Sequence, residues 1–312
     1  MFTFGRREDR IRTLEGMRMK NGQVKAILYA LLAAVLYALN TPVSKVLLEK
    51  IPPRMMAGFL YLGAGVGIGL LSLAKKDQST EKLEKSDLPY VIGMVVLDIA
   101  APVFLMFGIL NTEASTVSLL NNFEIVATTV VALVIFREKV SALLWGGIAL
   151  ITVSSILLST GGVFSFSFSW GAVFVLAATI CWGFENNCTR KISSKSTYEI
   201  VFIKGIFSGA GALLLGLLTG ERFFQIGYIL AAMLLGFVAY GLSIFFYIRA
   251  QRVIGAAKTS AYYAVSPFVG ALLSLVFLHE SLTGHFTAAL ILMIIGSVMV
   301  VADTLGVRPG KK

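Results

Sequence analysis

Two stretches of this chain decide its fold. They are ASTVSLLNNFEIVATTVVALVIFREKVS at residues 114–141 and AAKTSAYYAVSPFVGALLSLVFLHESL at residues 256–282. When the sequence is shifted on itself by 142 positions, Glu138 aligns with Glu280 and Arg137 with His279. A shift of 145 positions pairs Lys45 with Arg190. The nearly constant offset predicts that the chain is an internal duplication.

Long apolar runs extend outward from these stretches. Of 312 residues, 57% are hydrophobic and 14% are charged, and the mean hydropathy is +0.83. A soluble protein needs far more charged surface, so we expect lipid to be the solvent. About 20 apolar residues cross a bilayer. Ten segments qualify: 24–47, 54–74, 88–110, 114–136, 140–159, 170–190, 199–219, 225–248, 257–278 and 285–304. We therefore predict an all-α integral membrane protein of ten transmembrane helices.

The distribution of Lys and Arg predicts the orientation. Residues 110–114 and 160–169 contain no Lys or Arg, whereas the alternate turns are rich in both. Positive charge marks cytoplasmic segments, so we expect a multi-pass protein of the plasma membrane with both termini cytoplasmic. Residues 1–23 and 305–312 are then cytoplasmic tails, and residues 1–23 do not resemble a cleaved signal. The net charge of +10 is thus explained by topology, and we expect no nucleic-acid partner.

Five spans per copy is an odd number, so the second copy must enter the membrane from the opposite side. The charges agree, because the Arg137 turn is positive while its partner at His279 has no fixed positive charge. We predict two inverted five-helix repeats at 24–160 and 170–304. Many secondary transporters use such repeats for alternating access.

At this point the chain resembles the EamA family of the drug/metabolite transporter (DMT) superfamily. The similarity lies in "FREKVS", "LHESLT" and "RAQRVIGAAKTSAYYAVSP", within a five-plus-five arrangement over residues 24–304. The resemblance implies export of amino acids, small metabolites or drugs, often driven by protons. These motifs are mainly structural and identify no substrate.

Two acids fall where lipid is expected, Asp98 and Glu124. A charge at this depth costs about 3 kcal/mol or more, so each is a functional candidate. Glu124 forms a polar stripe at helical spacing together with Asn121 and Thr128. We predict that Glu124 couples protons or contacts substrate; the alternative is a protonated carboxyl group that bonds between helices. For Asp98, which precedes Pro102, a gate or pocket edge and a plain kink are both open.

No cation partner for either acid is evident near the membrane centre, which fits a proton site or a cationic substrate. The repeat partners of Asp98 and Glu124 are Tyr240 and Ser266. Further polar and aromatic groups favour a polar central cavity for a small amphipathic or aromatic solute. The predicted lining is Asn121, Thr128, Tyr37, Asn40, Thr41, Trp182, Asn186, Tyr240, Tyr247, Tyr263 and Ser266. For any one of these residues alone, interhelical packing is the better explanation; as a set they favour the cavity.

Other features predict structure rather than chemistry. We expect Lys45 to snorkel toward the interface, Glu185 to form a salt bridge with Lys204, and Cys181 and Cys188 to be apolar fillers. Glycines spaced along two spans predict close helix approach; they are Gly63, Gly65, Gly67, Gly69, Gly205, Gly209 and Gly211.

No enzyme signature is present. The sequence lacks a His-Glu-x-x-His zinc site, a P-loop and a Gly-x-Ser-x-Gly motif. We predict a cofactor-free secondary transporter, a proton-coupled exporter of a small metabolite such as an amino acid, amine or drug-like solute, acting as a monomer in membrane lipid. The alternatives are an uncoupled facilitator and, from a different class, a membrane sensor or scaffold.

Overall fold

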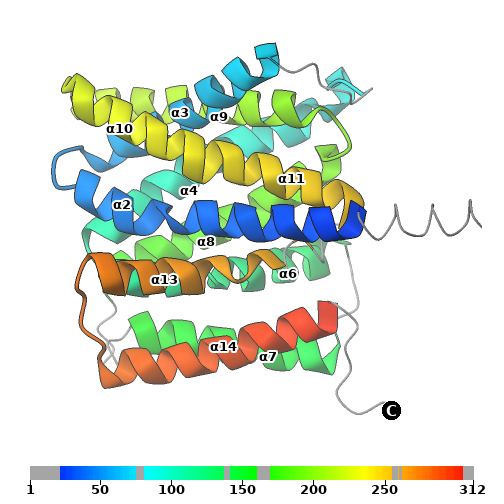
Figure 1. Cartoon of the computed structure of the whole chain (residues 1–312), viewed down its shortest axis with the longest axis vertical. Coiled ribbons are helices and arrows are strands. Elements are labelled where there is room, and N and C mark those ends of the chain that lie inside the picture. The colour runs from blue at the N-terminus through cyan, green and yellow to red at the C-terminus, as the bar shows by residue number, and fades with distance from the viewer. Residues whose placement is uncertain are drawn as a thin grey trace, which may run out of the picture.

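The structure is a computed structural model that describes residues 22–74, 81–136, 141–159, 169–254, 259 and 262–304. Within these residues the regular secondary structure is entirely helical (Figure 1). Most of the predicted N-terminal tail, the C-terminal tail and the turn at Arg137 lie outside the described residues. Cys181 and Cys188 are free thiols.

Six described helices are long and apolar enough to cross a membrane. They are Gly22–Leu47, Pro53–Ala74 (α3), Lys85–Leu110 (which contains α4, Leu88–Leu110), Thr197–Leu218 (α9), Ile226–Ile254 and Gly284–Asp303 (within α14, Gly284–Thr304). Two shorter apolar helices are Ala142–Leu158, within α7 (Ala142–Ser159), and α13 (Ser266–Phe277). α8 (Trp170–Ile192) has the length of a span but carries Glu185, Arg190 and Lys191. The protein is therefore an integral membrane protein.

Several helices are interrupted where the sequence analysis expects continuity. The predicted span 114–136 is divided at Asn121 and Asn122 into α5 (Ala114–Leu120) and α6 (Phe123–Phe136). There the backbone tightens, because Asn122, Glu124 and Ile125 donate to the carbonyl three residues earlier. Asn disfavours helix interiors since its side chain competes for backbone groups. The expectation of one continuous helix is wrong at this point.

Two further interruptions lie near the centre. The helix Gly22–Leu47 has a turn at Leu39, just before α2 (Asn40–Leu47), which contains Pro42. The span Ile226–Ile254 consists of α10 (Ile226–Gly236), a π-helical turn η2 (Phe237–Leu242) and α11 (Ser243–Ile254). Such π-turns frequently accompany functional sites in helices. Tyr240 lies in this turn.

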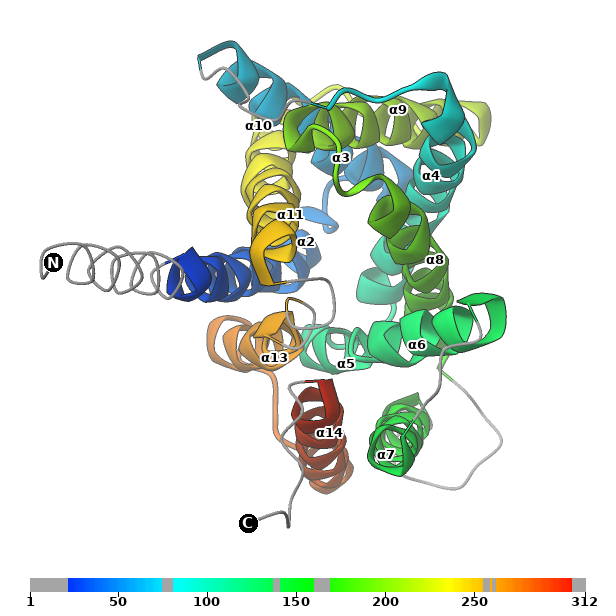
Figure 2. The same ribbon diagram turned by 90° about the vertical axis from the view of Figure 1, so that its right-hand side faces the viewer.

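Helices that are distant in sequence pack in pairs. The principal pairs are α3 with α9, α4 with α8, α5 with α13, and α7 with α14. Figure 2 shows the α7–α14 pair at one end of the molecule, where Ser154 donates a hydrogen bond of 2.7 Å to the carbonyl of Ala289. The bundle is thus built by contacts between the first and second halves of the chain.

The contact between α3 and α9 depends on glycine. A Cβ atom at Gly65 would lie 2.7 Å from the backbone nitrogen of Ile206, and one at Gly209 would lie 2.7 Å from that of Leu62. Both distances are too short for a real side chain, so the backbones approach directly. The predicted close approach of the glycine-rich helices is confirmed.

Candidate functional site

Three charged side chains meet in the interior of the bundle. The Nζ atom of Lys204 (α9) lies 3.0 Å from Oδ2 of Asp98 (α4) and 2.9 Å from Oε1 of Glu185 (α8). The side chains of Asp98, Glu185 and Lys204 are 0%, 2% and 7% exposed. Thr189 adds a hydrogen bond to the Glu185 carboxylate one turn along α8. We call Asp98, Glu185 and Lys204 the ion triad.

The ion triad corrects one expectation and confirms another. Asp98 has a cation partner, contrary to the sequence analysis, because α4 packs against both α8 and α9. The predicted pair of Glu185 and Lys204 is present. Two carboxylates share one ammonium group, so the fully ionised triad carries one net negative charge. Buried charges persist only when paired or hydrogen-bonded, and here both kinds of contact occur.

A hydrogen-bonded and aromatic network joins the ion triad to the first helix. The hydroxyl of Tyr61 donates to Oδ1 of Asp98 at 2.9 Å, and the rings of Tyr61 and Tyr240 lie 5.0 Å apart. Asn40 donates from Nδ2 to the hydroxyl of Tyr240 at 3.1 Å, and Ser44 donates to Oδ1 of Asn40 at 3.0 Å. Tyr61 is not among the site residues predicted from the sequence; its signal there is a lone phenol within an apolar, glycine-rich span.

Glu124 occupies a different setting near the start of α6. Asn186 on α8 donates from Nδ2 to Oε1 of Glu124 at 2.6 Å and approaches Oγ1 of Thr128 at 3.4 Å. The structure therefore brings together three predicted site residues: Glu124, Thr128 and Asn186. The hydrogen-bond partner described for the Glu124 carboxylate is a neutral amide.

Asn121 does not join this group. Its side chain is buried, and its Oδ1 atom has no hydrogen-bond partner within the described part of the chain. The predicted stripe of Asn121, Glu124 and Thr128 is divided at the tightened backbone of Asn121 and Asn122, and Asn121 lines a small cavity beside α13.

Three of the predicted aromatic residues gather around Tyr37, and a fourth lies against one of them. Its ring centroid lies 5.6 Å from that of Tyr240, 6.0 Å from that of Tyr263 and 6.3 Å from that of Trp182. Tyr247 lies 5.1 Å from Tyr263. The edge-to-face geometry of most of these pairs is the favoured one. Rings from the helix Gly22–Leu47, the span Ile226–Ile254, α8 and the segment before α13 thus form one cluster.

The remaining predicted lining residues surround a small cavity. Thr41, Asn121 and Ser266 line it together with Tyr37, and its volume is about 10 Å³. Ser266 donates to the carbonyl of Ala34 at 2.8 Å. A space of about one water molecule is thus present among the described residues that were expected to line a central cavity.

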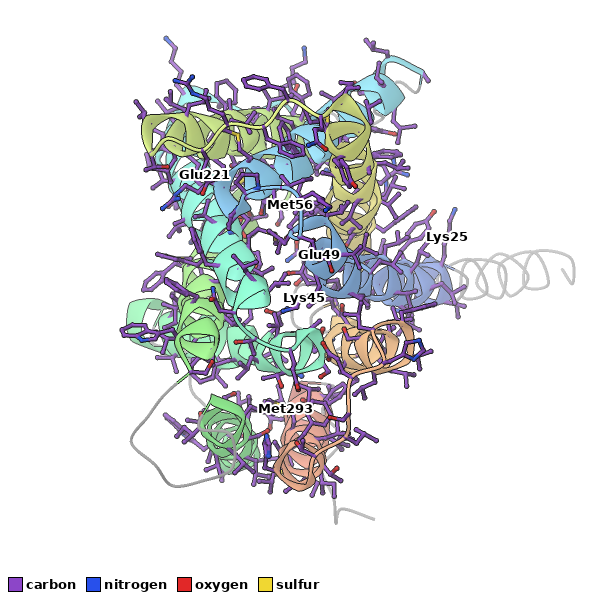
Figure 3. All side chains as sticks on the ribbon, turned by 90° about the vertical axis from the view of Figure 1, so that its left-hand side faces the viewer. Lys25, Lys45, Glu49, Met56, Glu221 and Met293 are labelled. Carbon is purple, nitrogen blue, oxygen red and sulfur yellow. The ribbon has the colours of Figure 1, made fainter. Side chains whose placement is uncertain are left out.

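Charged side chains tie the helix ends together at the end of the bundle that carries Lys45 (Figure 3). Lys45 donates from Nζ to the carbonyls of Ile109 and Thr112 at 2.6 and 2.7 Å. The Glu280 carboxylate accepts from the backbone N–H groups of Ala114 and Ser115 at 2.7 and 2.9 Å. Cations suit helix C-termini and anions suit N-termini. Lys45, which we expected to extend toward the membrane interface, thus binds the carbonyls at the end of α4.

The opposite end carries a second cluster. Lys195, in the turn between α8 and α9, lies 3.1 Å from Glu84 and 3.8 Å from Asp87. The hydrogen bond to Glu84 raises the pKa of Lys195. Both ends are therefore held by charged contacts between the two halves of the chain.

The comparisons with known proteins place this geometry in a family. The model of the EamA-like transporter family matches residues 24–160 and 169–302. An uncharacterized transporter of Methanothermobacter thermautotrophicus is 24% identical over 271 residues, covering 80% of this chain and 78% of that protein. The uncharacterized inner membrane transporter YedA of Escherichia coli K12 is 25% identical over 232 residues, covering 72% of this chain and 74% of YedA.

A solved crystal structure shares the fold, with a TM-score of 0.68 at 15% sequence identity, over 92% of this chain and 98% of that one. The family match spans most of the chain, and the relatives are named as transporters. The chain is a membrane transporter that belongs to the EamA-like transporter family.

Proposed function

We propose that this protein is a proton-coupled secondary transporter that exports a small metabolite by alternating access. Family membership supports transport. One observation carries the proton coupling: Glu124 is a carboxyl group inside the bundle whose described hydrogen-bond donor is the neutral amide of Asn186. Its charge can change without breaking an ion pair, and an intramembrane acid is a functional candidate by default.

We further propose ten spans arranged as two inverted repeats, 24–160 and 170–304. Under the 142-residue shift, α3 and α7 correspond to α9 and α14, and each packs against its own counterpart. α5 packs against α13, which lies in the counterpart of the predicted span 114–136. A two-fold axis in the membrane plane brings the elements beside it against their own counterparts. The interruption at Asn121 and Asn122 also has a counterpart, the turn at Ala264 and Val265. Interrupted helices in corresponding positions are a typical sign of a transport site.

The same proposal places the protein in the plasma membrane with both termini cytoplasmic. The Lys45 end, including Glu280, then faces outward, and the Lys195 end faces inward. The solute would bind against the aromatic cluster and the Glu124 carboxylate after the centre opens. Aromatic faces beside a carboxylate suit an amine or an aromatic amphipath.

The test begins with a thermal-shift screen of amino acids, amines and nucleobases against the purified protein. The stabilising solute is then followed into proteoliposomes with an acidic lumen. We expect accumulation driven by proton efflux, lost in Glu124→Gln, while counterflow without a gradient is retained. Glu113→Gln, which changes an exposed acid in the turn before α5, is the matched control and should behave as wild type.

The other outcomes separate the alternatives. Full gradient-driven accumulation by Glu124→Gln would show that this carboxyl group does not couple protons. Flux that is indifferent to the gradient in the wild type would indicate a facilitator. Absence of counterflow for every solute that stabilises the protein would favour a sensor or scaffold. The orientation is tested separately by labelling single cysteines at positions 113 and 195 from either side of intact cells.

A further inference from the structure

The small central cavity lies where the interrupted helices meet. Its lining comes from the helix Gly22–Leu47, from α5 and its end, and from α13. Two of its polar atoms, Oγ of Ser118 and Oδ1 of Asn121, have no hydrogen-bond partner in the described part of the chain. Both residues are buried, with exposed fractions of 2% and 6%. Unsatisfied polar atoms at such depth are rare and call for a specific partner.

The unsatisfied atoms continue along α5. The hydroxyl of Ser115 and both polar atoms of the Asn122 side chain also have no partner among the described residues. Ser115, Ser118 and Asn122 follow one another at spacings of three and four residues, which places them on one face of the helix. We call Ser115, Ser118, Asn121 and Asn122 the α5 seam. The seam begins at Ser115, whose backbone N–H donates to Glu280, and ends at the turn of Asn121 and Asn122 before Glu124.

The cavity chemistry suits water rather than an ion. A volume of about 10 Å³ accommodates about one water molecule, which needs two to four polar partners. Ser118 and Asn121 supply two, and the hydroxyls of Thr41 and Ser266 also line the space. A sodium ion requires more oxygen ligands and a nearby negative charge, and all four of these groups are neutral.

We propose that the cavity holds one ordered water molecule and that the α5 seam is the path by which protons reach Glu124 from the Glu280 end. This inference rests on the proposed function. The cavity water accepts a proton from a hydrated proton on the Glu280 side and releases another toward the Glu124 carboxylate, so that the water is restored and the carboxylate becomes a carboxyl group. The carbonyl of Asn121 accepts a hydrogen bond of 3.1 Å from the backbone N–H of Glu124, so the seam ends within one turn of this acid.

The charged groups around Glu124 lie on other helices than the proposed path. On α8, Asn186 bonds to the carboxylate and Glu185 repels it, while Lys204 on α9 attracts it. Tyr37 and Tyr263 of the aromatic cluster lie within electrostatic range of it. α7, which also packs against α6, carries no titratable side chain. The charged groups thus lie on the α8 and α9 side, and the neutral seam lies toward α13.

The glycine at position 270 allows the cavity to be filled. A Cβ atom there would lie 3.0 Å from Oγ of Ser118 and 3.4 Å from the carbonyl of Ala38. Gly270→Ala therefore places one methyl group in the space of the water. Gly227→Ala is the matched control, because no atom lies within 4 Å of the added carbon. Ser118→Ala is a second variant, which removes one partner of the water and adds no bulk.

The experiment follows protons and needs no substrate. The purified protein in a lipid film is switched from alkaline to acidic buffer, and infrared difference spectra record the carbonyl stretch of protonated carboxyl groups. The band lost in Glu124→Gln belongs to Glu124. We expect this band to appear about tenfold more slowly in Gly270→Ala and more slowly in Ser118→Ala, because proton transfer requires groups within hydrogen-bond reach. Gly227→Ala should match the wild type.

Each result has a distinct meaning. Equal rates in the wild type, Gly270→Ala and Ser118→Ala would overturn the path and leave the proposed function intact. A spectrum with no Glu124-dependent band would contradict the proposed function itself. The water is measured separately by X-ray hydroxyl-radical labelling, which modifies buried side chains beside bound water. We expect labelling of Pro267, another lining residue, in the wild type and its loss in Gly270→Ala; absence of labelling in the wild type would overturn the water site.

Discussion

Asp98 and Glu124 both lie inside the bundle, yet their charges are compensated in different ways. Asp98 shares Lys204 with Glu185 and accepts a hydrogen bond from Tyr61. Glu124 accepts a hydrogen bond from the amide of Asn186. Neutralising Asp98 leaves a paired lysine, whereas neutralising Glu124 removes a charge that has no described ion pair. The comparison separates an acid that helps to hold three helices from an acid whose charge can change.

The largest expected effect comes from Lys204→Met. It leaves two buried carboxylates without a cation, and breaking a buried ion pair costs about 3–5 kcal/mol. Denaturant titration in mixed micelles measures the loss. The triple variant Lys204→Met, Asp98→Asn and Glu185→Gln should recover most of the stability. If Lys204→Met is as stable as the wild type, the ion triad does not hold the bundle.

A smaller loss is expected from Tyr61→Phe. It removes the hydroxyl that donates to Asp98, and a hydrogen bond to a charged group contributes about 1.5–3 kcal/mol. The ion triad keeps Lys204, so the variant should remain more stable than Lys204→Met in the same titration. Tyr228→Phe, at a more exposed tyrosine, is the control. Equal losses in both tyrosine variants would remove Tyr61 from the network.

Glu124→Gln should change stability by about 1 kcal/mol or less, because the amide keeps the shape of the side chain and can still accept from Asn186. Proton-driven transport should nevertheless be lost. A loss of stability comparable to that of Lys204→Met would mean that Glu124, like Asp98, is mainly structural, and the contrast between the two acids would disappear.

Lys195→Gln should have the smallest effect. Ion pairs with exposed carboxylates contribute little, and the carboxylate of Glu84 is 68% exposed, so the thermal midpoint of Lys195→Gln at neutral pH should match that of the wild type. The raised pKa of Lys195 means that any contribution is complete at neutral pH and is lost only as the pH rises through that raised value. A destabilisation that persists at strongly alkaline pH would show that the packing of this side chain matters instead of its charge.

Much of the fold follows from the sequence because lipid imposes simple rules. Apolar runs of sufficient length predicted where helices lie, and the spacing of the glycines predicted the approach of α3 and α9. The break at Asn121 and Asn122 was missed, since two amides within an apolar run do not by themselves end a helix.

The site was predicted less completely. Glu185 and Lys204 were paired correctly because a short turn joins their helices. The partnership of Asp98 with Lys204 depends on α4 packing against α9, which is a property of the assembled bundle that one sequence does not contain. Tyr61 was missed for the same reason. The size of the central cavity depends on how the rings pack, which periodicity does not determine.

The pairing of α7 with α14 has a consequence for how the protein is made. Ser154 on α7 donates to a carbonyl of α14, the last helix that the structure describes. During synthesis α7 enters the membrane long before α14 leaves the ribosome. Until then the hydroxyl of Ser154 on α7 lies in lipid or against a helper protein. A chain that stops within α14 therefore leaves α7 without its partner, and we expect it to be degraded as an unfinished bundle.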